Sequence, residues 1–289
     1  MLRIALAALL LAACAHGRSG IGTFAQPEPY PLPAEAAARA PNVPAGTLTD
    51  TATYASRSYG YRFRYRLYVP AQYRAGTPVP LMVFQDASSV YLGQVNTPIV
   101  LDNLIGRGEM PPVIALFLDP GTPTGEYVHE RDKGLRSQEY DAIDERYVRF
   151  LVDEIVPDVV QAHYTLTPDG WGIAGQSSGG IAAFTAAWHR PDRFRRVLTQ
   201  NGSFVGIRGG NAYPTMIRAS APKPLRVYLL SGTKDLDNQF GRWLAANDAM
   251  AEALQDQRYA YRYRRGAGEH FPPRQAIADF PDALRWLWR

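Results

Sequence analysis

The chain contains a single cysteine, Cys14, among its 289 residues. One cysteine excludes an intrachain disulfide, and it also excludes any zinc site built from two or more cysteines of one chain. The chain also lacks a large excess of charge of either sign. Its formal net charge is +4, and the basic residues are scattered along the chain. This pattern lacks the basic stripe of a nucleic-acid-binding protein. The 46% of apolar residues is ordinary for a globular protein with a sizeable core.

The N-terminus has the organisation of an export signal. Arg3 supplies a positive charge, and residues 4–13 form an apolar run that is too short for a stable transmembrane helix. Small residues lead to Cys14, and this resembles the lipobox of bacterial lipoproteins. The resemblance implies a signal peptide over residues 1–13 and a lipid anchor on Cys14, which would place the protein in the periplasm or outer membrane of a Gram-negative-type bacterium. An ordinary secretory signal cleaved after Ala15 is the alternative, and it also predicts export.

Residues 14–50 have the composition of a tether. Prolines alternate with other residues at positions 27, 29, 31 and 33, and residues 34–44 continue with a similar composition. Such a segment favours an extended chain that buries little surface. We therefore expect one folded domain over residues 51–289.

The folded part alternates strands with helices. Residues 61–69 place arginines on one face and apolar side chains on the other, which predicts a half-buried antiparallel strand near an edge. Continuous apolar runs at 80–84 and 113–118 are typical of parallel strands covered on both faces. The same reasoning assigns strands to residues 171–174, 196–198, 225–230 and 259–263, and helices within 139–164 and over 181–189, 241–254 and 276–288. The order predicts a single α/β domain with a mostly parallel central sheet and helices on both faces.

A G-x-S-x-G motif at residues 175–179 follows a predicted strand and opens a predicted helix. In that context the central residue, Ser177, sits on a tight strand-to-helix turn of the α/β-hydrolase type, and this makes it the candidate nucleophile. The helix N-terminus offers free N–H groups to an oxyanion. Ser178 lies off the centre of the motif, and its backbone N–H is the candidate oxyanion donor. A glycine- and serine-rich turn without chemistry is the alternative.

The five histidines differ in position. His16 lies in the signal or tether, while His163 and His189 end predicted helices, where a cation near the C-terminal carbonyls is a common structural device. His270 lies in a glycine-rich segment after the last predicted strand, which is where this fold presents its base. His270 is therefore the candidate base, and His129, in a polar loop, is the second choice.

A catalytic histidine needs a carboxylate to orient it and to stabilise its charged form. Asp235 follows the strand at 225–230, so it should lie on the same carboxyl edge of the sheet as Ser177. Asp237, two residues later, stays open as the acid, and a helix N-cap is the alternative role for either aspartate. The order serine, aspartate, histidine is that of α/β-hydrolases.

Several segments together resemble the enterochelin esterase-like branch of the putative esterase family, which also contains esterase D-type enzymes, feruloyl esterases and mycolyltransferases. The resemblance covers roughly residues 50–289, and its segments are 81–86, 136–141, 175–188, 201–204, 232–238, 269–270 and 284–288. It implies the α/β-hydrolase fold and hydrolysis of carboxylic esters through an acyl-enzyme, with no metal or organic cofactor. It supports Ser177, Asp235 and His270 as the triad.

Further site residues are expected around the triad. The resemblance implies that Arg136, Glu139 and Tyr140 lie near the site as ordering or substrate-facing groups. The second oxyanion donor should come from the loop after the strand at 80–84, from Asp86 or Ala87. The family often has Asp-Gly at this point, and alanine lacks glycine's freedom at positive φ, so the geometry of this donor is an open question.

Substrate and partners follow in outline. The expected partner is a small-molecule or glycan-linked ester of the siderophore, feruloyl or acetyl type. Trp243 is a candidate wall of an aromatic acyl pocket, although such residues are more often core. The membrane is the second expected partner, through the lipid on Cys14, and no nucleic acid is expected. An acyltransferase on the same fold and a non-catalytic ligand-binding lipoprotein are the alternative functions.

Overall fold

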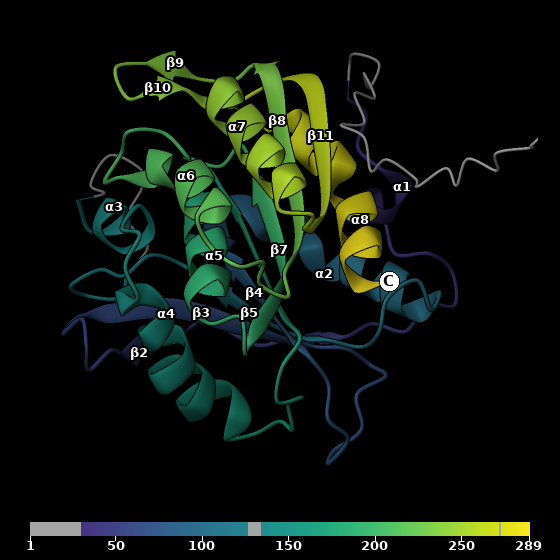
Figure 1. The fold of residues 1–289 in the computed structure, drawn as a ribbon. Coiled ribbons are helices and arrows are strands. Elements are labelled where there is room, and N and C mark those ends of the chain that lie inside the picture. Colours follow the sequence, from purple (N-terminus) through teal and green to yellow (C-terminus); the bar gives the residue numbers. More distant parts are fainter. Residues whose placement is uncertain (1–29, 127–133, 272) are drawn as a thin grey trace, which may run out of the picture.

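The computed structural model describes residues 30–126, 134–271 and 273–289. One twisted sheet runs through the centre, with helices packed on both of its faces (Figure 1). The strand order is β1-β3-β5-β4-β6-β7-β8-β11, and β2 also pairs with β3. The strands are β1 (Thr47–Leu48), β2 (Ala52–Ala55), β3 (Arg62–Val69), β4 (Leu81–Gln85), β5 (Ile114–Leu118), β6 (Trp171–Gln176), β7 (Phe194–Gln200), β8 (Arg226–Lys234) and β11 (Ala260–Glu269).

Strand direction follows the hydrophobic patterns. The strands β5, β4, β6, β7, β8 and β11 run parallel, and in β4 and β5 every residue is buried. The amphipathic β3 is antiparallel to β5 and carries β1 and β2 at its outer side. The predicted α/β architecture is therefore confirmed, including the antiparallel strand near one edge.

Two layers of helix cover the sheet. The helices α2 (Thr97–Gly106) and α8 (Arg274–Trp288) enclose a core on one face, while the helices of the other face enclose a second core. That second layer contains α4 (Arg146–Phe150), the π-helical η3 (Leu151–Gln161), α5 (Ser178–His189), α6 (Tyr213–Arg218) and α7 (Trp243–Asp256). Short elements complete the fold: α1 (Ala34–Ala37), η1 (Ala87–Tyr91), α3 (Gly134–Tyr140), η4 (Gly210–Ala212), and a hairpin of β9 (Asp237–Asn238) and β10 (Gly241–Arg242).

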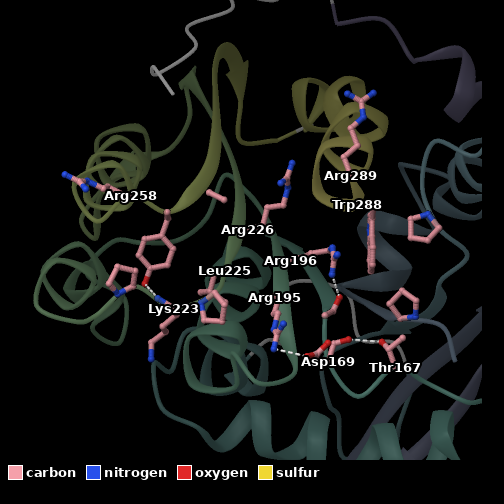
Figure 2. A pocket seen from close by; sticks show the side chains of 17 residues that line it. Thr167, Asp169, Arg195, Arg196, Lys223, Leu225, Arg226, Arg258, Trp288 and Arg289 are labelled. Carbon is pink, nitrogen blue, oxygen red and sulfur yellow. Dashed lines mark hydrogen bonds and ion pairs between the residues drawn. The ribbon is translucent and has the colours of Figure 1, made fainter. Parts of the chain in front are cut away.

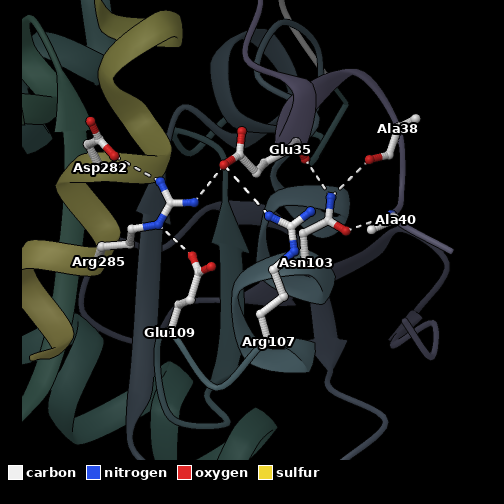
Figure 3. Close-up of polar contacts among 8 residues, drawn as sticks. All are labelled: Glu35, Ala38, Ala40, Asn103, Arg107, Glu109, Asp282 and Arg285. Atoms are coloured by element: carbon white, nitrogen blue, oxygen red, sulfur yellow. Dashed lines mark hydrogen bonds and ion pairs between the residues drawn. The ribbon is translucent and has the colours of Figure 1, made fainter. Parts of the chain in front are cut away.

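The segment expected to be a free tether is packed against the domain from residue 30 onward. Tyr30 and Ala36 are buried, and β1 pairs with β3. Figure 3 shows Arg285 of α8 reaching Glu35 at 2.6 Å, and Asn103 of α2 donating to backbone carbonyls of the same segment. The proline-rich segment forms only short elements of its own, and side chains of α2 and α8 supply the contacts that hold it on the domain. The folded unit therefore begins about 20 residues earlier than expected.

The glycine-rich segment before His270 is also different from the expectation. It was predicted as a loop, but β11 continues through it to Glu269. A Cβ on Gly266 or Gly268 would collide with the side chain of Gln275 in α8. These glycines therefore serve the close packing of α8 on the sheet rather than loop flexibility.

Three expectations fall on residues that the structure does not describe: the signal peptide over residues 1–13, the lipid anchor on Cys14, and the second-choice base His129. Within the described ranges, no helix has both the length and the apolarity needed to cross a bilayer.

Candidate active site

Polar residues come directly after the parallel strands and gather at the carboxyl edge of the sheet. Asp86 follows β4, Ser177 follows β6, Asn201 follows β7, Asp235 follows β8 and His270 follows β11. At the first three the backbone φ is positive, at 52°, 57° and 52°, and this turns the chain sharply away from the strand. Because neighbouring parallel strands end at one edge, residues far apart in the sequence meet there.

The sequence motif at residues 175–179 forms a sharp turn. Ser177 adopts φ 57° and ψ −122° between β6 and α5, a strained conformation for a residue with a side chain. A Cβ on Gly175 would overlap the backbone of Gly179, and a Cβ on Gly179 would press on the carboxylate of Asp86. The two glycines of the motif are therefore required by close approach of the helix to the strand and to the β4 loop.

His270 and Asp235 form a buried hydrogen-bonded pair. His270 Nδ1 lies 2.6 Å from Asp235 Oδ1, which also accepts from the backbone N–H of Leu236 at 2.8 Å. Asp235 Oδ2 accepts from Asn201 Nδ2 and from Ser231 Oγ, both at 2.7 Å. Burial by itself raises the pKa of Asp235, but the hydrogen bond and charge of His270 and the two neutral donors hold that pKa below its ordinary value. The carboxylate is thus ionised and fixed in orientation.

The turn at Ser177 is tied to this pair by a hydrogen bond. Gln176, the residue before Ser177, donates from Nε2 to the backbone carbonyl of His270 at 3.0 Å. The alternative acid, Asp237, is exposed in the β9–β10 hairpin, where it pairs with Arg242 at 3.2 Å. The geometry therefore favours Asp235 over Asp237 as the partner of the histidine.

Ser203 is a site residue that the sequence did not reveal. Its Oγ lies 3.3 Å from Ser177 Oγ, and Trp243 Nε1 donates to it at 3.2 Å. The Trp243 ring also meets the His270 ring edge-on, with centroids 6.0 Å apart. The Trp243 indole therefore contacts both residues, Ser203 as a hydrogen-bond donor and His270 through its ring. The only signal in the sequence was that Ser203 belongs to the short segment 201–204 that resembles the esterase family.

The loop after β4 carries Asp86 and Ala87, the candidates for the second oxyanion donor. The positive φ falls on Asp86, a residue type that tolerates the left-handed region, and Ala87 is the first residue of η1. Ala87 is therefore not required to adopt a positive φ in this loop. Arg136 grips the Asp86 carboxylate with two hydrogen bonds of 2.7 Å, and its side chain is only 15% exposed. Ser178 begins α5, so its N–H belongs to the first turn of the helix, where no acceptor exists within the helix.

Glu139 and Tyr140 are fully buried, so neither faces a substrate in this structure. Tyr61 donates its hydroxyl to Glu139 Oε1 at 2.6 Å, and the backbone N–H of Gly121 donates at 3.2 Å. Burial raises the pKa of Glu139 to about 8. These residues order the chain behind Arg136, while Arg136 itself keeps a little exposure.

An exposed apolar rim lies beside the histidine and its acid. Large hydrophobic side chains with substantial exposure are few in the described part of the chain, and three of the four lie in this region: Leu236 at 40%, Phe240 at 44% and Phe271 at 64%. Leu236 is next to Asp235, and Phe271 is next to His270. Such clustering is typical of a surface that receives an apolar group.

The acidic side chains at this edge are engaged by other side chains of the protein. In the ranges that the structure covers, no group of three or more histidine, cysteine, aspartate or glutamate side chains is arranged to hold an ion. The carboxylates of Asp86 and Asp235 are instead engaged by Arg136 and His270.

The sharp serine turn at the carboxyl edge of a mostly parallel sheet defines an α/β-hydrolase fold, and solved structures agree. An enterobactin esterase from Shigella flexneri, crystallised in the presence of enterobactin, superposes with a TM-score of 0.69 at 22% identity, over 87% of this chain and 60% of that one. A ferulic acid esterase from Anaeromyces mucronatus, in complex with ferulic acid, gives a TM-score of 0.69 at 18% identity, over 89% and 96% of the two chains.

The family follows from the sequence comparison. The model described as Putative esterase matches residues 56–286, and the chain belongs to this family. Among curated proteins, an iron(III) enterobactin esterase from Dickeya dadantii (strain 3937) is 37% identical over 98 residues. That alignment spans 34% of this chain and only a fifth (20%) of the relative's length.

Proposed function

We propose that the protein is a serine carboxylic-ester hydrolase in which Ser177, His270 and Asp235 act as nucleophile, base and acid. The observation that carries the proposal is the pair of His270 Nδ1 and Asp235 Oδ1 at 2.6 Å, tied through Gln176 to the strained turn of Ser177. Membership of an esterase family and the enterobactin and ferulic acid esterases that share the fold support the same reaction.

The reaction follows from these positions. His270 takes the proton from Ser177 Oγ, which attacks the carbonyl carbon of the ester, and the carbonyl oxygen becomes an oxyanion. The backbone N–H of Ser178 and that of Asp86 or Ala87 hold the oxyanion. The tetrahedral intermediate then expels the alcohol, which receives the proton from His270. Water attacks the acyl-enzyme by the same route and releases the acid.

Ser203 has a positioning role in this proposal. An indole N–H can only donate, so the Trp243 hydrogen bond occupies a lone pair of Ser203 Oγ and leaves the Ser203 proton free. That proton can be donated to Ser177 Oγ at 3.3 Å, which directs the Ser177 proton toward the base. Ser203 does not take part in bond making.

The substrate class we propose is an ester whose acyl side carries a hydroxylated aromatic ring. The rim of Leu236, Phe240 and Phe271 supplies apolar surface for a ring, and Trp243 supplies an aromatic wall beside the base. Two enzymes of the same fold were crystallised with molecules of this chemistry, one with 2,3-dihydroxy-N-benzoyl-serine and one with ferulic acid.

The activity test uses the purified chain with p-nitrophenyl acetate and with ethyl ferulate, beside Ser177→Ala and a fluorophosphonate label. We expect turnover of both esters and labelling of the wild type, and neither in the variant. A folded wild-type protein that neither turns over these esters nor reacts with the label would refute the hydrolase proposal and favour the non-catalytic binding lipoprotein.

We further propose that the chain is exported and anchored by a lipid on Cys14. The support is the short apolar run of residues 4–13 ending in small residues before the single cysteine. Growth with radiolabelled palmitate should label the wild type and leave Cys14→Ala unlabelled. Label in the variant, or none in either protein, would contradict the anchor.

A further inference from the structure

A hollow lies at the amino edge of the sheet, opposite to the carboxyl edge where Ser177 lies. Its walls come from residues at the amino ends of β4, β6, β7, β8 and β11 and from the last residues of α8. Its volume is about 660 Å³, which is within the range of cavities that take small-molecule ligands. Figure 2 shows Arg196 and Arg226 near the middle of the hollow, with Arg258, Lys223 and Arg289 around its margin.

The hollow is strongly basic. Asp169 is the only acidic residue among the described residues of its lining, and it pairs with Arg195 at 2.8 Å. Among the residues that the structure describes, the other cations of the lining have no carboxylate at ion-pair distance. The cationic residues of the lining are Arg195, Arg196, Lys223, Arg226, Arg258 and Arg289.

Two of these arginines are fixed in place by neutral partners. Arg196 and Arg226 lie side by side on β7 and β8, and their Nε atoms donate to the backbone carbonyls of Leu287 at 3.0 Å and Trp286 at 2.8 Å. Arg196 stacks over the ring of Trp288 with its guanidinium carbon 4.5 Å from the centroid. These contacts orient the guanidinium groups without neutralising them. Burial, and then the neighbouring charges of Arg226 and Arg195, lower the pKa of Arg196, while Asp169 acts in the opposite direction.

We infer that this basic hollow is a binding site for a ligand that carries phosphate groups. Guanidinium forks match phosphate oxygens in a bidentate manner, and pre-oriented arginines lose little freedom on binding. The site lies across the sheet from the ester-hydrolysing edge, so it is independent of that reaction.

Arg258 allows a test that keeps the fold. It follows α7 with φ 56°, a left-handed position at which glycine is the favoured residue. Arg258→Gly therefore removes one cation of the hollow without straining the backbone. Arg74→Gln is the matched control, because Arg74 is an exposed arginine whose hydrogen bonds go to the backbone carbonyls of Ala71 and Tyr73, away from the hollow.

Titration calorimetry of the purified chain with inorganic pyrophosphate at low salt is the experiment. We expect saturable binding by the wild type, roughly tenfold weaker binding by Arg258→Gly, and wild-type binding by Arg74→Gln. Absence of binding to the wild type, or equal weakening in both variants, would overturn the inference.

Vesicles distinguish the sources of the phosphate. Sedimentation with phosphatidylglycerol vesicles that pyrophosphate competes away, and that Arg258→Gly weakens, would identify a lipid headgroup as the ligand. Pyrophosphate binding without vesicle binding would identify a soluble phosphorylated molecule. Both results support the site, and p-nitrophenyl acetate hydrolysis should be the same in Arg258→Gly and wild type whichever source is found.

Discussion

Replacement of Asp235 by asparagine is the sharpest test of the proposed mechanism. All four groups that contact the Asp235 carboxylate donate to it: His270 Nδ1, the Leu236 N–H, Asn201 Nδ2 and Ser231 Oγ. An amide of the same shape offers one acceptor oxygen and one NH2 group. The NH2 group of the asparagine must therefore face donors, whichever of the two carboxylate oxygens it replaces. The negative charge that stabilises the imidazolium is also lost.

The magnitude follows from the charge. Two unit charges about 4 Å apart interact by about 4 kcal/mol at an effective dielectric constant of about 20. If this stabilisation exists only when the imidazole is protonated, its loss slows acylation by roughly a thousandfold. We expect kcat for p-nitrophenyl acetate to fall by that factor in Asp235→Asn, with KM changed little and with the fluorophosphonate label attached correspondingly slowly.

Asp237→Asn is the matched control. Asp237 is an exposed carboxylate two residues away that pairs with Arg242, so its loss should leave kcat within about twofold of wild type. A thousandfold loss in Asp237→Asn with a small loss in Asp235→Asn would reverse the assignment of the acid. A small loss in both variants would refute the role given to the carboxylate.

Three further outcomes are expected. Ser203→Ala should lower kcat about 3–10-fold at unchanged KM, because one neutral hydrogen bond to Ser177 is lost, and Ser203→Thr should restore most of it; full activity in Ser203→Ala would exclude the positioning role. Burial places the folded-state pKa of Glu139 at about 8, above its ordinary value, so its contribution to stability is present in acid and is lost as the pH rises through 8. Glu139→Gln should therefore match wild type at pH 5 and exceed it by roughly 1–3 kcal/mol at pH 8.5 in urea unfolding; parallel pH curves would contradict this. A chain that starts at Thr51 should lose roughly 3–5 kcal/mol relative to one that starts at residue 30, because the buried carboxylate of Asp102 loses its partly exposed partner Arg39 and the Gly46 N–H; equal urea midpoints would show that the segment adds nothing.

Local signals in the sequence were sufficient for the architecture and for the sheet edge at which the candidate site residues lie. Continuous apolar runs marked β4 and β5, because a parallel strand covered on both faces has no polar side. The motif around Ser177 predicted a sharp strand-to-helix turn, because only glycine permits the approach of strand and helix there. Asp235 and His270 could be placed near one another because each follows a parallel strand, and the carboxyl ends of parallel strands meet at one edge of the sheet.

Tertiary structure decided what local patterns do not encode. The segment around Glu35 has the composition of a tether, and only the facing side chains of α2 and α8 supply partners that hold it on the domain. The glycines of β11 look like a loop until Gln275 packs on them. The role of Ser203 depends on Trp243, which lies on a different element 40 residues away.

The choice between Asp235 and Asp237 shows the same division. In sequence the two aspartates differ by two positions in one polar stretch, and either satisfies the rule that the acid follows the strand. In the structure the chain turns at Asp235, so that its side chain enters the buried edge while Asp237 is carried out into an exposed hairpin. Hydrophobic periodicity determined which segments form the sheet, because it is a property of neighbouring residues. Which polar side chains meet at its edge was decided by packing between distant segments, because that depends on where the whole chain brings them.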